Sequence, residues 1–436
     1  MAREMKDSGI EWIGEIPEEW DILRLKSLFS FGKGLPITKD SLVEIGVPVI
    51  SYGQIHGKYN SGVHLHNELI RYVPETYLTT NPESLVHEGD LILADTSEDI
   101  DGCGNCAYID SNMQVFAGYH TIILKASKQT NNKYIAYLMK TDPWRSQLRS
   151  KVSGVKVFSI SRKIISNAVI ILPPVPTQHR IAAFLDRKCA EIDSVIADTQ
   201  KTIDEYKALK QSIITEAVTK GVRGERKMKD SGVEWIGDMP EEWEVTRIKN
   251  LFAYRNERNS LPLEDVNLIS LYTDKGVVQH SDLEETTGNK ASNADGYKLV
   301  YENDIVVNII LCWMGAIGRS AYNGVTSPAY DVYAPKAGTF SHFYHYYFRT
   351  QGFSGDCYKV GRGIMAMRWR TYSDQFRALS VIYPSVREQI EIVTYLDRKC
   401  AEIDRLIAAK QQLLTELEAY RKSVIYEYVT GKKEVQ

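Results

Sequence analysis

The sequence predicts an α+β protein of two globular mixed α/β modules separated by two long antiparallel coiled-coil helices, in a pseudo-two-fold circular arrangement. Three observations predict this class. Two segments of the chain recur, two helical segments share one heptad stripe, and the intervening stretches hold short β-rich runs broken by turn residues. A chain of 436 residues is also too long for a single core.

The first repeat covers residues 5–20 and returns at 228–243, and each copy contains Met-Lys-Asp-Ser-Gly, Glu-Trp-Ile-Gly and Pro-Glu-Glu-Trp. A second repeat, Leu-Asp-Arg-Lys-Cys-Ala-Glu-Ile-Asp, occupies 185–193 and 396–404. The copies of the first repeat are 223 residues apart, and those of the second are 211 apart. These unequal offsets indicate two copies of one unit, with modules of different length between them.

One copy of this unit is continuous in the centre of the chain, and the other is divided between the two termini. We therefore expect 5–29 to lie beside the 382–436 helix. The sequence divides into five parts: an N-terminal part of the split repeat (1–29), a first module (30–171), the central repeat with a long spacer helix (172–252), a second module (253–381), and a C-terminal spacer helix that completes the split repeat (382–436).

The two long helices are predicted by residues at alternating spacings of three and four, the heptad pattern of a coiled coil. The first stripe is Leu185, Cys189, Ile192, Ile196, Thr199, Ile203, Tyr206, Ile213 and Ala217. The second is Leu396, Cys400, Ile403, Ile407, Lys410, Leu414, Leu417, Val424 and Tyr428. Lys210 and Arg421 interrupt the stripes at equivalent positions. Because both stripes belong to one chain, an internal pair is favoured over a dimerisation coil between chains.

Local signals set the limits of both helices. Pro176 suits a first helical turn, and the pair Ser385 and Glu388 has the spacing of a capping box. Gly221 and Gly431 are expected to end the helices. Roughly 40 residues at about 1.5 Å each predict helices on the order of 60 Å long.

The two modules share a sequence skeleton despite strong divergence; Gly154, for example, aligns with Gly363. The aromatic run at 341–348 could serve as a base-stacking platform, but its helical counterpart in the first module favours a packed core helix. Diverged modules on similar repeats suggest that the modules recognise two different things.

The net charge of −3 argues against a protein that holds nucleic acid unaided. Two basic stretches nevertheless fall at the same place in both modules, just before the repeated helix. The stretch 140–163 contains seven basic residues and one acid, and 349–377 contains six basic residues and two acids. Recurrence in two otherwise different modules favours a shared binding edge over an ordinary solvated surface.

The contact candidates lie in and after glycine-containing turns of these stretches. Glycine lets a backbone approach a phosphate closely, while Lys and Arg supply charge and Arg can read guanine with two hydrogen bonds. The candidates are Lys151, Lys156, Arg162, Lys163, Lys359, Arg362, Arg368 and Arg370. The acidic loop around Asp95 reads as solvated, although a carboxylate near DNA can accept from a cytosine amino group.

Catalytic motifs are missing from the sequence. It contains no phosphate-binding Gly-x-x-x-x-Gly-Lys-Ser/Thr loop, and no Gly-x-Gly-x-x-Gly follows a strand. The motif that would hold a flipped adenine has only a poor match at 81–84, and no Pro-Asp dipeptide starts a common nuclease motif. Cys103 and Cys106 form a lone Cys-x-x-Cys, which favours an ordinary turn over a metal site because zinc needs four ligands.

Composition predicts a cytoplasmic location. The six cysteines are scattered, which fits a reducing compartment better than a disulfide framework. No signal peptide and no bilayer-length apolar run is recognisable.

Taken together, these features closely resemble the specificity subunit of Type I restriction-modification systems. The resemblance rests on the Pro-rich entry at 171–176, the glutamines Gln178 and Gln389, the Leu-Asp start of each long helix, and the repeat at 9–20. It covers nearly the whole chain and is specific as a set. One departure is the second helix entry, where Pro-Ser-Val-Arg replaces Pro-Pro-Val-Pro.

The resemblance implies a non-catalytic subunit whose modules are target recognition domains, each reading one half of a bipartite, asymmetric DNA site. The spacer helices would fix the gap, and the repeats would each dock one methyltransferase subunit. Restriction subunits, which combine translocase and endonuclease, would join for cleavage. S-adenosylmethionine, ATP and magnesium would belong to those partners, and none is expected in this chain. The partners would also supply phosphate contacts that the net charge does not provide.

Two other classes of function stay open at this point. The coiled coil could belong to a scaffold protein without sequence-specific DNA binding. The chain could also be a self-contained nuclease or methyltransferase, against which the missing motifs argue.

Overall fold

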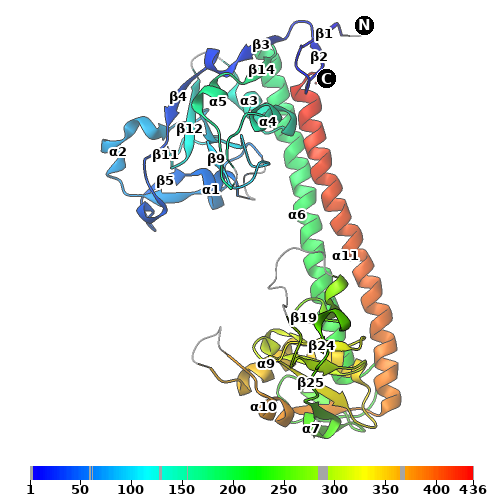
Figure 1. Ribbon diagram of the computed structural model, residues 1–436. Helices are drawn as coiled ribbons and strands as arrows, with labels where there is room; N and C mark the ends of the chain where they lie inside the picture. The colour runs from blue at the N-terminus through cyan, green and yellow to red at the C-terminus, as the bar shows by residue number, and fades with distance from the viewer. Residues whose placement is uncertain are drawn as a thin grey trace. The chain divides into compact units, whose positions relative to one another are not determined.

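The computed structural model describes residues 3–57, 60, 62–126, 130–154, 156–282, 293–363 and 369–435 (Figure 1). The chain divides into two compact units, one of 1–200 with 412–436 and one of 201–411. Each unit therefore takes in one expected module together with part of each long helix. The predicted α+β class is confirmed, since strands and helices mix within both units.

The first unit is built on two four-stranded sheets. One has the order β10-β8-β12-β4 and is antiparallel, and the other has the order β6-β5-β11-β7 with a parallel β5–β11 pair. The strands of the first are Cys106–Tyr108, Leu91–Ala94, Thr121–Ala126 and Phe29–Lys33. Those of the second are Arg71–Val73, Val47–Ile50, Val115–Ala117 and Leu85–Val86. β8 is buried along its whole length, which explains its unbroken apolar run.

Short helices complete the first unit. They are α1 (Tyr52–Ile55), α2 (Tyr77–Thr80), α3 (Asn132–Met139), α4 (Asp142–Arg149) and α5 (Arg162–Ser166). Each of the last three begins after a residue whose side chain accepts from a backbone N–H of the first turn. A two-stranded ribbon of β9 (Thr96–Ser97) and β13 (Phe158–Ser159) joins the end of β8 to the segment before α5.

The second unit repeats the central four-stranded sheet in the order β18-β25-β22-β23. These strands are Phe252–Arg255, Tyr330–Pro335, Ile305–Asn308 and Ile317–Arg319. Two separate ribbons, β19–β20 (Ile269–Tyr272, Gly276–Gln279) and β21–β24 (Lys298–Val300, Gly324–Thr326), replace the second sheet of the first unit. Its short helices are α7 (Ile248–Leu251), α8 (Ser341–Phe348), α9 (Gln351–Val360) and α10 (Ser373–Ala378).

The repeated sequence folds in the same way in both units. In the first, β1 (Met5–Asp7) pairs with β2 (Glu15–Pro17), and β3 (Asp21–Arg24) pairs with β14 (Val169–Leu172). In the second, β15 (Met228–Asp230) pairs with β16 (Asp238–Pro240), and β17 (Glu244–Arg247) pairs with β26 (Ser380–Tyr383). Matching turns are held by an aspartate that accepts from the glycine N–H two residues on.

The split repeat packs against the C-terminal helix, as its sequence predicts. The fully buried Trp20 shares a core with Val424 and Val429, and the Tyr426 hydroxyl donates to the Trp12 carbonyl at 3.2 Å. Its counterpart Trp243 is buried in the second unit in the same way, with residues of the 214–218 segment.

The two long helices are α6 (Val175–Lys220) and α11 (Val386–Val429), which lie side by side within each unit (Figure 1). Their heptad stripes face inward: every residue of the two predicted stripes is buried or half-buried. Gly221 and Gly431, with φ of 78° and 73°, follow the ends of the helices in the left-handed conformation that the sequence predicted.

The capping box predicted at the start of α11 is only half right. The Ser385 hydroxyl accepts from the Glu388 N–H at 3.3 Å, as expected. The Glu388 carboxylate does not complete the box, because it accepts instead from the Trp243 indole N–H at 2.9 Å and binds Arg226. A buried indole and guanidinium outweigh a solvent-accessible backbone amide as partners for a carboxylate.

The aromatic run of α8 forms core, in agreement with the favoured interpretation. Phe343, Tyr344, Tyr347 and Phe348 are fully buried, and their rings contact one another edge to face, tilted or stacked. These four rings therefore cannot serve as an exposed stacking platform.

Candidate nucleic-acid interface

A glutamine at the start of each long helix ties that helix to its module. Gln178 is nearly fully buried; its side chain accepts from the Asn131 N–H at 2.9 Å and donates to the Pro173 carbonyl at 2.7 Å. Gln389 makes the same two bonds, accepting from Phe340 at 2.9 Å and donating to a proline carbonyl at 2.8 Å. Each bond satisfies a backbone group at a helix end.

A tyrosine–aspartate bond makes a second attachment. The Tyr137 hydroxyl of α3 donates to Asp186 of α6 at 2.9 Å, and the Tyr346 hydroxyl of α8 donates to Asp397 of α11 at 2.7 Å. Both aspartates belong to the repeated Leu-Asp. The repeated residues thus hold each module on its helix through the same contacts.

The residues that interrupt the heptad stripes form ion pairs across the helix pair. Arg421 binds Asp193 at 2.6 Å in the first unit, and Lys210 binds Asp404 at 2.7 Å in the second. Both aspartates end the second repeat. Because an antiparallel pair brings equivalent residues of two copies into reciprocal contact, these ion pairs fix the register in each unit.

Equivalent backbone pairing closes a glycine-containing hairpin in both modules. Ser153 and Ser159 exchange two backbone hydrogen bonds, and so do Arg362 and Arg370. Five residues separate the paired positions in the first module, and seven do in the second. Gly154 has a φ of 131°, and an added Cβ would lie 1.9 Å from the Val157 carbonyl oxygen, so the turn requires glycine.

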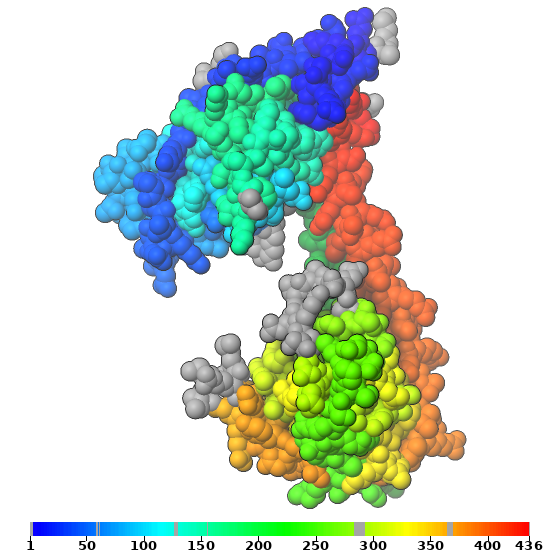
Figure 2. Space-filling view, in the orientation of Figure 1, coloured from blue at the N-terminus to red at the C-terminus, as the bar shows by residue number. Residues whose placement is uncertain are grey.

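The candidates of the first module lie on the surface around this hairpin. Lys151, Lys156, Arg162 and Lys163 are all exposed, and the segment is the green-cyan patch of the first unit in Figure 2. Within the described residues none of the four forms an ion pair; the Arg162 guanidinium lies 5.6 Å from the Phe31 ring centroid. Their charges are therefore available to a phosphate backbone.

The candidates of the second module are less uniform. Arg362 and Arg370 are exposed at the base of the hairpin, where their backbone pairing places both side chains on one face. Lys359 instead binds Glu234 at 2.7 Å. Arg368 lies outside the described residues. Trp369 stacks on Tyr358 with ring centroids 5.2 Å apart, and the Trp369 ring lies directly against Gly361.

Other basic residues of the two stretches point inward. The Lys140 ammonium donates to the Asn60 carbonyl and side chain at 2.8 and 2.7 Å, and burial lowers the pKa of Lys140 to about 8. Arg149 donates to the Asp101 carbonyl at 2.7 Å, and Arg349 donates to four backbone carbonyls. The sequence analysis included these cations in the predicted binding edge, but in the structure they donate hydrogen bonds to groups of the protein itself.

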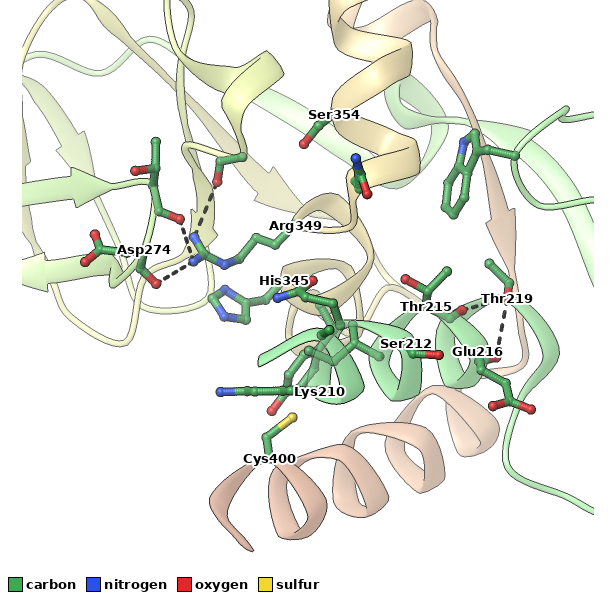
Figure 3. A pocket seen from close by; sticks show the side chains of 18 of the residues that line it. Lys210, Ser212, Thr215, Glu216, Thr219, Asp274, His345, Arg349, Ser354 and Cys400 are labelled. Carbon is green, nitrogen blue, oxygen red and sulfur yellow. Dashed lines mark hydrogen bonds between the residues drawn. The ribbon is translucent and has the colours of Figure 1, made fainter. Parts of the chain in front are cut away.

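A cleft of about 1440 Å³ lies in the second unit between α6, α8 and α11 (Figure 3). Lys210 and Arg349 contribute positive charge to it, and Glu216 and Asp404 contribute negative charge. His345 lines its wall, and burial beside Arg349 lowers the pKa of this imidazole to about 3, so it is neutral. The mixed charge gives the cleft no preference for a polyanion. Sequence reasoning did not find it, because its walls come from distant segments.

The Cys-x-x-Cys pair lies within the first module. Cys103 and Cys106 are both buried, and burial raises the pKa of both thiols, which keeps them protonated. In the part of the chain that the structure describes, no three His, Cys, Asp or Glu side chains cluster as metal ligands would. Among the same residues, no helix has both the length and the apolar character to cross a membrane.

One group of surface side chains escaped the sequence analysis. Tyr52, Tyr119 and His120 gather beside Asp95, with ring centroids 5.4–5.9 Å apart. Apart from the neighbours Tyr119 and His120, they come from separate segments, and they follow no periodic pattern. Only the positions of Asp95 and His120 directly beside β-rich runs could have indicated a common edge.

The repeated fold and its surface hairpins define a chain with two similar domains on shared long helices. The family model described as the type I restriction modification DNA specificity domain matches this chain twice, over 17–203 and 240–419. The chain therefore belongs to that family.

Individual relatives are more distant. The MjaVIII specificity subunit of a type I restriction enzyme from Methanocaldococcus jannaschii is 25% identical over 238 residues, which cover 54% of this chain and 50% of the relative. The EcoKI specificity subunit of Escherichia coli is 22% identical over 210 residues, which cover 47% of this chain and 44% of the relative. The chain spans about half the length of the curated relatives that it matches.

Solved structures support the fold over nearly the whole length. A chain from a study of complex assembly and conformational transition of the type I R-M system aligns with a TM-score of 0.70 and 15% identity, covering 96% of this chain and 99% of that one. The HsdS subunit from Thermoanaerobacter tengcongensis aligns with a TM-score of 0.50 and 15% identity, covering 96% and 98%.

Proposed function

We propose that this chain is the DNA sequence-recognition subunit of a Type I restriction-modification complex. The observation that carries the proposal is that both units hold their modules through the same set of contacts. The same glutamine, tyrosine–aspartate and hairpin contacts recur in both units, while the hairpins differ in length and side chains. Each recognition domain would accordingly read one half of an asymmetric, bipartite DNA site, with 30–171 and 253–381 as the two domains.

The basic residues that the sequence analysis singled out would contact DNA. Lys151, Lys156, Arg162 and Lys163 would serve in the first domain, and Lys359, Arg362, Arg368 and Arg370 in the second. Lysines contribute mainly phosphate attraction, whereas arginines can also read guanine in the major groove. The ion pair of Lys359 with Glu234 would have to open for its ammonium to reach a phosphate.

The long helices would set the gap between the half-sites. Residues of both predicted stripes support this role because their burial holds the two helices in one register: Leu185, Ile192, Ile196, Ile203, Tyr206, Leu396, Ile403, Ile407, Leu414 and Leu417. A matched insertion in both helices should widen the gap.

The two copies of the repeat would each dock one methyltransferase subunit. Glu18 and Glu241 are equivalent and exposed, and within the described residues neither carboxylate forms a hydrogen bond or an ion pair. Identical exposed residues in two copies suit a partner that binds twice. Restriction subunits would join the same assembly, and S-adenosylmethionine, ATP and magnesium would bind the partners, so this subunit itself would not be catalytic.

Footprinting of the chain with its methyltransferase subunits on duplex DNA tests the proposal. Two protected blocks separated by an unprotected gap are expected. Replacement of 30–170 by the matching segment of another specificity subunit should change one block and leave the other intact. A single protected block, a change of both blocks, or DNA cleavage by the purified chain alone would contradict the proposal.

A further inference from the structure

A compact polar cluster lies on one edge of the first recognition domain, outside the basic residues assigned above. Tyr52 follows β5, Asp95 follows β8, and His120 precedes β12, so the three segments meet where their strands end. The His120 ring lies 5.4 Å from Tyr52 and 5.9 Å from Tyr119, both edge to face. His120 is 57% and Asp95 30% exposed at the side chain, which leaves the cluster open to a ligand.

The backbone holds this cluster in a fixed place. The Asp95 N–H donates to the His120 carbonyl at 3.1 Å, and the Asp95 carbonyl accepts from the Ile160 N–H at 2.8 Å. His120 has a φ of 55°, which is uncommon for a residue with a side chain and is sustained here by these bonds. Asp95 and His120 are therefore presented from rigid strand ends.

The hydrogen bonds within the cluster determine which of its donor and acceptor atoms are left for a ligand. The Thr96 hydroxyl donates its one hydrogen to Asp95 Oδ1 at 2.8 Å. The His120 Nδ1 lies 3.3 Å from the same hydroxyl oxygen, so Nδ1 must be the donor in that contact. In the tautomer that carries its proton on Nδ1, His120 has a bare Nε2. Within the described residues, this Nε2 and Asp95 Oδ2 have no partner, so the cluster presents two acceptors to solvent.

The acceptors lie next to the basic hairpin. β9 pairs with β13, which places Thr96 opposite Ser159. Arg162 follows Ser159 by three residues. Lys156 is on the same hairpin. A duplex whose phosphates contact Lys156 and Arg162 would thus bring base edges to Asp95 and His120.

The second domain carries different chemistry at the same backbone positions. Thr371 N–H donates to the Ile309 carbonyl at 2.9 Å, as Ile160 does to Asp95. Ile309 follows β22 as Asp95 follows β8, and Ala329 precedes β25 as His120 precedes β12. Two acceptors in one domain are replaced by two apolar side chains in the other. Different side chains at equivalent backbone positions are what two domains need in order to recognise different base sequences.

The geometry points to Asp95 and His120 as base-reading residues of the first domain, selecting a base that presents an exocyclic amino group in the major groove. Cytosine N4 and adenine N6 are such donors, whereas guanine and thymine present acceptors at the corresponding position. This inference rests on the proposed function and adds the residues and the hydrogen-bonding class of one base.

The test uses the full chain, assembled with its methyltransferase subunits, and a library of duplexes with randomised half-sites. Sequencing of the bound fraction gives the preference at each position for wild type, Asp95→Asn and His120→Ala. Both variants are expected to lose preference at one or two adjacent positions of one half-site by roughly 5- to 150-fold, the span of one good base contact. The other half-site should be unchanged.

His87→Ala is the matched control. The exposed His87 lies 4.0 Å from the largely buried Asp90 at the opposite end of β8, roughly 13 Å away along four strand residues. The control should keep the wild-type profile, and thermal melting should show that all variants fold. An unchanged profile in both cluster variants, or a uniform loss of affinity without a change of profile, would overturn the inference while leaving the proposed function intact. A wild-type complex without any sequence preference would refute both.

Discussion

Among the contacts that join a repeat to a long helix, the one made by the buried carboxylate of Glu388 can be tested most directly by mutation. Its side chain is only 1% exposed; it binds Arg226 at 2.5 Å and accepts from the Trp243 indole N–H at 2.9 Å. Arg226 also lies over the Trp243 ring at 5.2 Å. Glu388→Ala removes the acceptor of both partners at once, while Glu388→Gln keeps an acceptor for the indole and removes the charge.

The expected loss of unfolding free energy depends on which hydrogen bonds and ion pairs each partner of Glu388 keeps in the variants. Loss of one member of a buried ion pair costs about 3–5 kcal/mol when the other charge is left uncompensated. Arg226 keeps bonds to Glu242 at 2.9 Å and to the Lys220 carbonyl at 2.6 Å, so its charge is not stranded. We therefore expect Glu388→Ala to destabilise the second unit by about 2–3 kcal/mol, including the unpaired indole, and Glu388→Gln by about 1–2 kcal/mol.

Urea unfolding of the full chain, with hydrogen exchange to assign the effect to 201–411, measures these differences. Glu391→Ala is the control, because Glu391 pairs with Arg223 at 2.7 Å on the same helix but is 34% exposed. An exposed pair of this kind contributes about 0–1 kcal/mol. A Glu388→Ala effect no larger than that of Glu391→Ala would refute the reasoning that burial makes this carboxylate structurally important.

Four further changes test other parts of the molecule. Thr177 is the first-unit equivalent of Glu388, and the buried Trp20 indole N–H of that unit has no hydrogen-bond partner among the described residues. Thr177→Glu should therefore stabilise the first unit by about 1 kcal/mol in urea unfolding; a destabilised variant would contradict the equivalence. Arg421→Asp should lower stability by about 1 kcal/mol and Asp193→Arg in the same chain should restore it, which a double-mutant cycle measures; additive effects would deny the pairing. Lys156→Ala should weaken binding of all duplex sequences and reduce the slope of log affinity against log salt by about 1, in contrast to Lys140→Met, whose ammonium faces inward. The pKa of Lys140 is lowered to about 8, so between pH 8 and about 10.5 the unfolded chain binds one proton more than the folded chain. The stability of the wild type should therefore rise with pH in this window by up to about 3 kcal/mol relative to Lys140→Met. A difference in melting that stays constant across the window would show that the ammonium is not buried.

The long helices and the repeats were predictable because their signals are local. Heptad spacing encodes a buried stripe whatever else the chain does, and Gly221 and Gly431 end the helices through their own backbone conformation. The split of one repeat between the termini also predicted that Trp20 would share a core with the C-terminal helix, and it does.

The direction of charged side chains was not predictable in the same way. Lys140 and Lys151 belong to one basic stretch, yet Lys140 donates to Asn60, eighty residues away, whereas Lys151 is exposed. The partner of Glu388 was also missed, because the capping box is a local rule and Trp243 is 145 residues distant. Burial and long-range partners decide such cases.

The sequence by itself determined that two mixed modules are carried by two paired helices and that the helices and repeats are duplicated. Periodicity, end signals and repetition suffice for this, since each acts over a few residues. Only the tertiary structure decided which cations face outward and that Asp95 and His120 meet at one edge. Their strands must first pair before the ends can converge, and no local pattern records that convergence.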